Sequence, residues 1–139
     1  MKKYSLIIIF FLIFSCKESV DKKKDIVYLS PDCGCCHDWI SHMESNDFIL
    51  EKNMDANMYD IKINAGLPID LASCHTALIQ GYFIEGHVPA EDVKRLLKEA
   101  PDNIIGLTVP GMPAGINVPG MEVNNEKANF DVLAIDSNG

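Results

Sequence analysis

The sequence has little positive charge and no long apolar run. Its 139 residues contain 12 Lys and Arg against 20 Asp and Glu, a formal net charge of −8. An acidic surface is a poor match for nucleic acid, or for anionic lipid bound by charge, because both ligands are negative. No apolar stretch reaches the roughly 20 residues that a membrane-spanning helix needs. The length indicates a single domain, and the acidic charge argues against nucleic acid as its ligand.

The apolar stretch at the start is typical of a secretion signal. Leu6 to Phe14 follows the positive start Met1-Lys2-Lys3 and has the length of a signal-peptide core. It ends in a small residue followed by Cys16, a pattern similar to bacterial lipoprotein signals. We therefore expect a lipoprotein signal peptide over residues 1–15 and lipidation of Cys16. An ordinary signal peptide, or an anchor with an incidental cysteine, is the alternative.

The next segment predicts a tether. Residues 16–25 would comprise the lipidated Cys16 and a flexible polar link that contains Lys22-Lys23-Lys24. A membrane-contacting lysine patch is the alternative. Loss of Lys2 and Lys3 with the leader would leave 10 basic against 20 acidic residues. The expected location is the bacterial cell envelope, facing the periplasm or the exterior. The protein would contact the membrane only through its N-terminal lipid.

Three of the five cysteines lie within four residues, at Cys33, Cys35 and Cys36. They follow a strand-like run at 26–29 and precede a helical pattern from 36 to about 45. Backbone N–H groups and the helix dipole at a helix start favour thiolate over thiol. If Cys16 is acylated, Cys74 is the fourth thiol of the exported domain. Four such thiols predict disulfides, a metal site, or a site that alternates between the two.

The pattern of elements predicts an α/β fold of the thioredoxin-like class, with the order β-α-β-α-β-β-α. The domain would span residues 26–139. After the first strand and helix we expect a strand at 48–52, a helix at 56–65, hairpin strands at 75–79 and 82–85, and a helix from 89 to 100. A Gly/Pro/Met-rich ordered loop extension at 106–120 and an extra strand at 130–135 would follow.

Cys74 lies at the entry to the hairpin, in a loop that faces the cysteine motif in a thioredoxin-like fold. It would point a fourth sulfur at the other three; a buried core cysteine is the alternative. The segment Val-Pro-Gly-Met occurs twice, ending at Met112 and at Met121. Thiolates with thioethers select Cu(I), although loop packing would also explain the methionines.

Three histidines lie near these cysteines in the sequence. His37 follows Cys36, His75 follows Cys74, and His87 lies at a helix entry. Each is more often a surface or hydrogen-bonded residue than a ligand. His75 alternates with Cys74 along the strand, so we expect its side chain to face away from the sulfurs.

Five ordered blocks resemble the CopG-type family of exported copper-resistance proteins, long described as a domain of unknown function. They are Ser30-Pro31-x-Cys33-Gly34-Cys35-Cys36-x-x-Trp39, Leu71-Ala72-Ser73-Cys74-His75-Thr76-Ala77, Tyr82-x-x-Glu85-Gly86-His87-Val88-Pro89, Gly106-Leu107-x-Val109-Pro110-Gly111-Met112-Pro113 and Pro119-Gly120-Met121-Glu122. The resemblance implies a thioredoxin-like fold and copper bound through cysteines, with a copper oxidoreductase role in copper tolerance. By position, the ligands would be Cys33, Cys35, Cys36 and Cys74, with His75, Met112 and Met121 as further candidates.

Two functions remain open beside copper binding. A thiol-disulfide oxidoreductase would use Cys33 and Cys36 as its catalytic pair, but Cys35 and Cys74 are sulfurs that such an enzyme does not need. A structural zinc site usually has two separated C-x-x-C pairs, and the spacing here is three plus one. Copper ions, and a copper-exporting or copper-carrier protein, are the expected partners.

Overall fold

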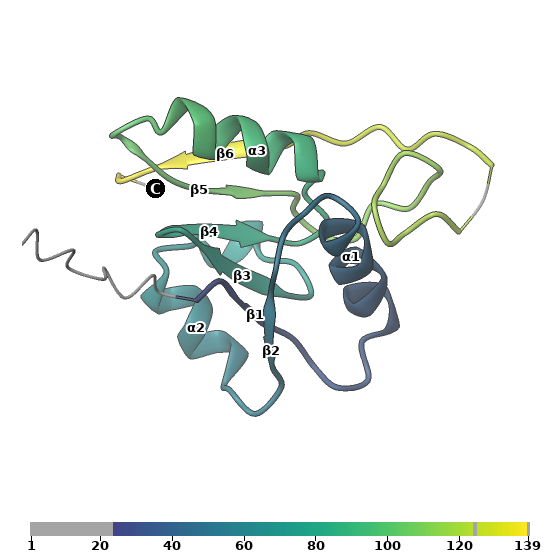
Figure 1. The fold of residues 1–139 in the computed structure, drawn as a ribbon, viewed down its shortest axis with the longest axis horizontal. Coiled ribbons are helices and arrows are strands. Elements are labelled where there is room, and N and C mark those ends of the chain that lie inside the picture. Colours follow the sequence, from purple (N-terminus) through teal and green to yellow (C-terminus); the bar gives the residue numbers. More distant parts are fainter. Residues whose placement is uncertain (1–23, 124, 139) are drawn as a thin grey trace, which may run out of the picture.

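The computed structural model describes residues 24–123 and 125–138. The expected signal peptide, Cys16 and most of the tether lie outside the described residues. The domain is a mixed α/β fold in which three α-helices pack against one six-stranded sheet (Figure 1). The elements are β1 (Ile26–Tyr28), α1 (Gly34–Glu44), β2 (Glu51–Asn53), α2 (Met58–Asn64), a 3-10 turn (Ile69–Leu71), β3 (Thr76–Ile79), β4 (Tyr82–Glu85), α3 (Ala90–Glu99), β5 (Ile104–Thr108) and β6 (Leu133–Asp136).

The strand order in the sheet is β2-β1-β3-β4-β5-β6. β1 and β2 run parallel and are joined by α1, and β3 lies antiparallel to β1 on its other side. β3 and β4 form an antiparallel hairpin with a tight turn at Gln80-Gly81, and both turn residues have positive φ. The element order through α3 therefore agrees with the order predicted from the sequence.

The expectation of a loop from Gly106 onward is wrong at its start. Residues 104–108 form β5, which runs parallel to β4, and α3 is the crossover between these two strands. A Cβ on Gly106 would lie 2.4 Å from the Phe83 carbonyl oxygen. Glycine is thus required there by close backbone approach, although in the sequence it interrupts the apolar run and disguises the strand.

Local sequence explains where the helices begin. Asn57 caps α2, since its Oδ1 accepts the Tyr59 N–H at 3.1 Å. Glu91 and Asp92 occupy the first turn of α3, where acidic side chains suit the helix dipole. α1 begins at Gly34, two residues before the predicted start, so Cys35 and Cys36 both lie in its first turn.

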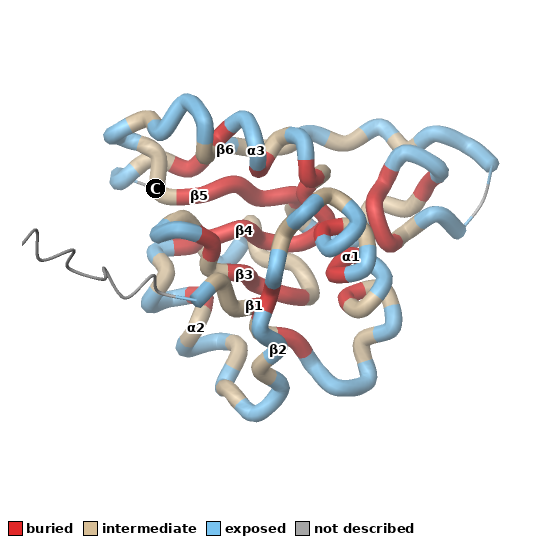
Figure 2. Tube along the Cα trace, in the orientation of Figure 1, coloured by how far each residue is buried: buried red, intermediate tan, exposed pale blue. Residues whose placement is uncertain are grey.

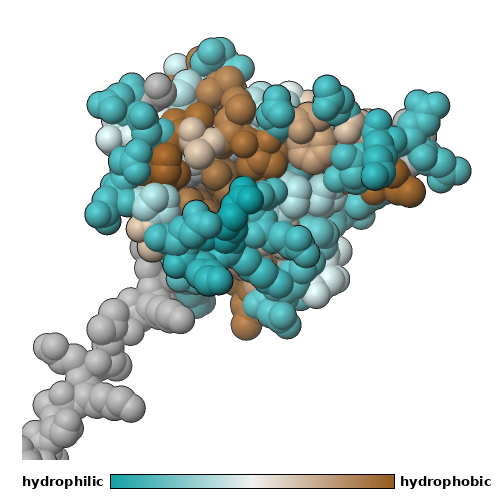
Figure 3. Space-filling model, turned by 90° about the horizontal axis from the view of Figure 1, so that it is seen from above, coloured by the Kyte–Doolittle hydropathy of each residue, from teal (hydrophilic) through white to brown (hydrophobic). Residues whose placement is uncertain are grey.

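The sheet has an apolar cluster on each face. The larger one packs α1 and α3 against β1, β3, β4 and β5, and it includes Trp39, whose Nε1 donates to the Val88 carbonyl at 2.8 Å. The smaller cluster contains Leu67, Phe83 and Ile135. Figure 2 shows the buried positions concentrated along the central strands, and Figure 3 shows apolar side chains gathered within a largely polar surface. Within residues 24–123 and 125–138, no helix has the length and apolar character needed to cross a membrane.

Candidate metal centre

The start of α1 holds three sulfurs. Cys33 is the N-cap residue of α1, and its side chain makes no capping hydrogen bond. Cys33 and Cys36 are joined by a disulfide, whereas Cys35 is free and its Sγ lies 3.5 Å from that of Cys33. Cys36 is fully buried, while Cys33 and Cys35 are half-buried. A disulfide and a free thiol therefore lie side by side.

Cys74 joins this group from the other side of the site. It lies two residues before β3, the strand that pairs with β1, and β1 leads into the cysteine motif. The sulfurs of Cys33, Cys35, Cys36 and Cys74 all lie within 4.8 Å of one another. This is the placement expected from the sequence, and sulfurs at this spacing are close enough to share metal ions.

His87 adds a nitrogen donor to Cys74. Its Nδ1 lies 2.8 Å from the Pro119 carbonyl oxygen, which only an N–H can bond, so Nδ1 carries the ring proton. Nε2 is then the unprotonated nitrogen, and it lies 3.3 Å from the Cys74 Sγ. A backbone carbonyl that fixes the tautomer is the usual support of a metal-binding histidine. Burial lowers the pKa of His87, which keeps the ring neutral.

His75 also turns toward Cys74, contrary to the expectation from strand alternation. Its Nδ1 lies 3.3 Å from the Cys74 Sγ, because Cys74 precedes the regular strand and does not follow its alternation. The ring is fully buried against Trp39, with ring centroids 4.4 Å apart. Burial, then the neighbouring His87 and the positive Lys62, lower its pKa to about 3. Its Nε2 has no hydrogen-bond partner among the described residues.

The second donor group is therefore Cys74, His75 and His87, whose ligand atoms also lie within 4.8 Å of one another. Burial, and next the Cys35 thiol, raise the pKa of Cys74 to about 11. The metal-free thiol is therefore protonated at neutral pH, and a metal that binds Cys74 must displace its proton. Cys74 belongs to both groups and links the sulfurs to the imidazoles.

The hairpin register explains why His87 belongs to the site. Thr76 pairs with Glu85 in the β3–β4 ladder, so continuing the register outward brings Cys74 opposite His87. Sequence reasoning did not select His87 as a ligand. The signal was nevertheless present, because the predicted turn at Gln80-Gly81 fixes this register.

The C-terminal loop closes over α1. A Cβ on Gly120 would lie 2.5 Å from the Trp39 backbone nitrogen and 2.8 Å from the Cys35 carbonyl oxygen, so the loop lies directly on the helix backbone. The neighbouring Pro119 holds His87 through its carbonyl. Met121 follows in the same loop and is half-buried.

The other two candidates from the sequence have different surroundings. Met112 is 57 % exposed and lines a shallow pocket with Pro113 and Phe130. His37 lies with its Nε2 3.4 Å from the Pro31 carbonyl oxygen. Neither His37 nor Met112 belongs to the two donor groups, and a ligand role for Met112 and Met121 stays a prediction.

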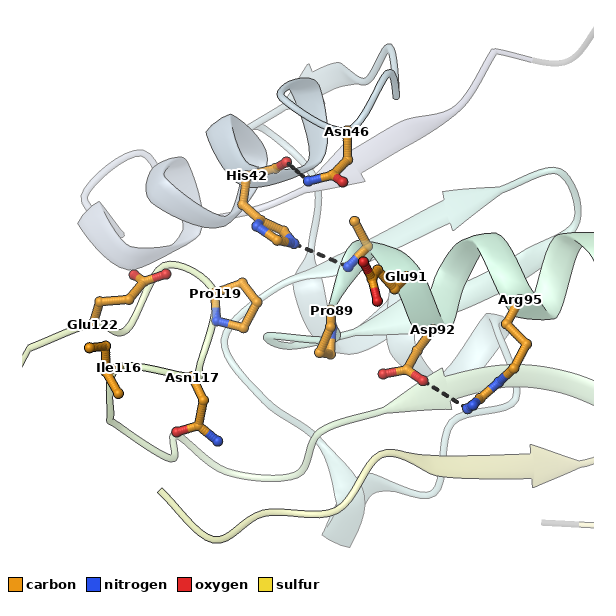
Figure 4. A pocket seen from close by; sticks show the side chains of 11 residues that line it. His42, Asn46, Pro89, Glu91, Asp92, Arg95, Ile116, Asn117, Pro119 and Glu122 are labelled. Atoms are coloured by element: carbon orange, nitrogen blue, oxygen red, sulfur yellow. Dashed lines mark hydrogen bonds and ion pairs between the residues drawn. The ribbon is translucent and has the colours of Figure 1, made fainter. Parts of the chain in front are cut away.

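A cavity of about 640 Å³ lies between α1, the start of α3 and the C-terminal loop, and none of the four sulfurs lines it (Figure 4). His42 uses its Nε2 to accept the Ala90 N–H at 3.1 Å, and Asp92 pairs with Arg95 at 2.7 Å. His42, Asp92 and Arg95 are thus already bonded to other residues that line the cavity. Pro119 lines it as well, so the cavity borders the loop that holds His87.

Comparisons with known proteins place the chain in a family. Residues 71–121 match the model of a family described as "Protein of unknown function, DUF411". A comparison with curated proteins found no match. Two solved structures, titled "Copper resistance protein copG- Form 2" and "Copper resistance protein copG- Form 1", share 38% sequence identity with the chain. The first has a TM-score of 0.75, and the match covers 84% of this chain and 90% of the solved chain. The second has a TM-score of 0.76, and the match covers 86% of this chain and 92% of the solved chain. The chain therefore belongs to the CopG-type family of copper-resistance proteins.

Proposed function

We propose that this protein is a membrane-tethered, exported copper-binding protein that acts in copper resistance and holds Cu(I) through Cys33, Cys35, Cys36 and Cys74. The observation that carries the proposal is the convergence of these four sulfurs within 4.8 Å. Two imidazole nitrogens at 3.3 Å from the Cys74 sulfur support it. Solved relatives at 38% identity are titled copper resistance proteins.

The chemistry of the donors favours Cu(I) over harder ions. Soft thiolates select Cu(I), and imidazole also suits copper. Cys35 and Cys36 are adjacent on one helical turn and cannot easily bind a single ion at ideal angles, so we infer bridging thiolates and more than one copper per chain. Zinc is the less favoured metal, although a sulfur and two imidazoles would accept it.

The fold supports a redox function as well. We infer a thioredoxin-like domain, because the thiols lie between β1 and α1, β1 and β2 are parallel, and β3 and β4 form an antiparallel hairpin. Oxidation of the Cys33 and Cys36 thiolates to one disulfide releases two electrons, which two Cu(II) ions would take up to become Cu(I). Cys35, Cys74 and the two imidazoles would remain available to the product ions.

A thiol-disulfide oxidoreductase is the second candidate function. The Cys33–Cys36 disulfide at the start of α1 favours it, because this is where a catalytic disulfide would exchange with thiols of a substrate protein. The free Cys35 and Cys74 beside the disulfide count against it, since both would compete with a substrate thiol.

The location and the tether remain proposals from the sequence. We propose lipidation of Cys16, a position in the bacterial cell envelope, and transfer of copper to or from an exporter or carrier protein. Fractionation of cells that express the full chain tests the anchor. The wild-type chain is expected with the membranes, whereas Cys16→Ser is expected to lose lipid and leave them.

The metal function is tested by anaerobic titration of the reduced full chain with Cu(I) against a chromogenic Cu(I) chelator. Cys74→Ser is expected to weaken binding, because it removes the sulfur shared by both donor groups. Cys16→Ser is the matched control, since it makes the same substitution outside these groups. A wild-type chain that takes no copper from the chelator would refute the proposal, and disulfide reduction on a protein substrate would then test the second candidate.

A further inference from the structure

A buried ion pair lies against the segment that carries Cys74. Glu85 ends β4 with its side chain fully buried, and Lys62 of α2 reaches it with a side chain that is 8% exposed. The Lys62 Nζ lies 2.5 Å from the Glu85 Oε1. Burial of two charges is costly, and their attraction often fails to offset that cost. Stability alone is therefore a weak explanation for this pair.

The Glu85 carboxylate holds the chain on both sides of Cys74 and His75. Its Oε1 accepts the Ser73 backbone N–H at 2.6 Å, and its Oε2 accepts the Thr76 hydroxyl at 2.6 Å. Lys62 donates to the same Thr76 hydroxyl at 2.9 Å. Both oxygens of the carboxylate are thus used on residues that directly flank the two metal-donor candidates.

The residues that follow Glu85 also contact the segment that carries Cys74. The Gly86 N–H donates to the His75 carbonyl at 3.0 Å. Gly86 has φ +68°, and a Cβ there would lie 2.6 Å from the Ser73 side chain, so the two segments are in close contact. His87 then reaches Cys74. A displacement of Glu85 would therefore be transmitted to the donors on both segments.

We propose that Glu85 is a positioning residue of the metal site: its carboxylate, held by Lys62, fixes residues 73–76 so that the Cys74 sulfur faces the other cysteines and both imidazoles. The proposal rests on the proposed metal function. Charge-assisted hydrogen bonds to backbone and hydroxyl donors are shorter and stronger than neutral ones, which suits a group that must fix a loop. Glu85 touches no donor atom itself and acts through Ser73 and Thr76.

The first test is Glu85→Gln in the reduced full chain that carries Cys16→Ser. The amide keeps the size of the side chain, but it leaves the Lys62 charge unpaired and takes the acceptor from the Thr76 hydroxyl. We expect at least a tenfold loss of Cu(I) affinity in competition with the chelator. Glu51→Gln is the matched control, because it breaks an exposed Lys–Glu pair with an N–O distance of 2.9 Å, and we expect less than a twofold change.

A double-mutant cycle separates positioning from general destabilisation. If Glu85 acts through Cys74, then Glu85→Gln costs little further affinity in a Cys74→Ser background. The Glu85→Gln single variant is also expected to lose the part of the thiolate-to-copper absorption that depends on Cys74. Equal losses in both backgrounds would overturn the proposal, because they would show an effect that does not depend on Cys74.

A copper-free measurement tests the positioning of Cys74 by Glu85 even if the protein binds no copper. With Cys16→Ser and Cys35→Ser, the oxidised chain keeps Cys74 as its single free thiol. We expect Glu85→Gln to speed alkylation of Cys74 at least tenfold, and Glu51→Gln to leave the rate within twofold. Faster alkylation in a chain that binds no Cu(I) would refute the metal function and uphold the positioning of Cys74.

Thr76→Val keeps the test decisive if Glu85→Gln does not fold. It removes one hydroxyl at constant shape and leaves the ion pair in place. We expect changes in Cu(I) affinity and Cys74 alkylation in the same direction, of about threefold or more. Unchanged affinity and unchanged alkylation in a folded Thr76→Val or Glu85→Gln protein would overturn the proposal.

Discussion

Replacement of His75 by phenylalanine should stabilise the metal-free protein. The His75 ring is fully buried on Trp39, and its Nε2 has no hydrogen-bond partner among the described residues. An unsatisfied buried polar group costs about 1–3 kcal/mol, whereas the hydrogen bond between the His75 Nδ1 and Cys74 is worth about 1 kcal/mol. Phenylalanine has a similar shape and no polar atom. We therefore expect a gain of roughly 1 kcal/mol in the free energy of unfolding at pH 7.

The same substitution should flatten the loss of stability in acid. The pKa of His75 is lowered to about 3 from its ordinary 6.5, chiefly by burial. A group with a lowered pKa contributes stability that is present above pH 6.5 and is lost as the pH falls toward 3. At about 1.4 kcal/mol per pH unit, the loss between pH 6.5 and pH 4 is roughly 3 kcal/mol. His75→Phe should lack this part of the pH dependence.

Urea unfolding of the disulfide-bonded, metal-free chain between pH 7 and pH 4 measures both effects. His37→Phe is the matched control, because it makes the same substitution at a half-buried ring that lies outside the two candidate donor groups. We expect the His37→Phe chain to follow the wild type across this range. An unchanged acid dependence in His75→Phe would refute the reasoning, since His75 would then not be the group held neutral by burial.

Three further outcomes are expected. The Cu(I) affinity should rise with pH, since the Cys74 thiol, with a pKa of about 11, must lose its proton to bind. Dissociation constants measured at pH 6, 7 and 8 give the number of protons released on binding. That number should be lower by about one in Cys74→Ser, and equal numbers in the two proteins would contradict this. Gly120→Ala should lower the free energy of unfolding by about 2 kcal/mol or more and weaken copper binding, because the added Cβ meets the α1 backbone. Gly111→Ala is the control, since Gly111 also has positive φ but lies in open space, and it should lower the free energy of unfolding by about 1 kcal/mol. Equal losses in thermal unfolding would exclude the close contact as the cause. Oxidation of Cys33 and Cys36 should lower the copper content after gel filtration, and an unchanged content would argue against both as ligands.

The sequence predicted the parts of the fold that are set by local pattern. The helical face of α3 and the Gln80-Gly81 turn are local signals, and both elements occur in the structure. β5 was missed because Gly106 serves a long-range contact with Phe83, which no local pattern reveals. The formation of β5 therefore depends on long-range packing that the local sequence does not indicate.

The candidate site divides in the same way. The three cysteines near α1 are visible as a cluster in the chain, and Cys74 was predicted to join them from the element order. The inward turn of His75 depends on where the regular β3 ladder begins, one residue later. The role of Glu85 depends on a contact with Lys62 across 23 residues, which composition and spacing do not indicate.

The candidate donors come from three separated parts of the chain, and under the proposed function this affects when copper would bind. Residues 33–36, 74–75 and 87 meet only after β3 has paired with both β1 and β4, and Pro119 must then close on His87. Closing loops of this length before the sheet exists costs chain entropy, which lowers the affinity of the unfolded chain for an ion held by all three segments. We therefore expect the unfolded chain to offer copper chiefly the local thiols near α1, and the complete donor set to form with the sheet. A bound ion would then join distant segments as a cross-link does, and the domain would unfold more slowly with copper than without it.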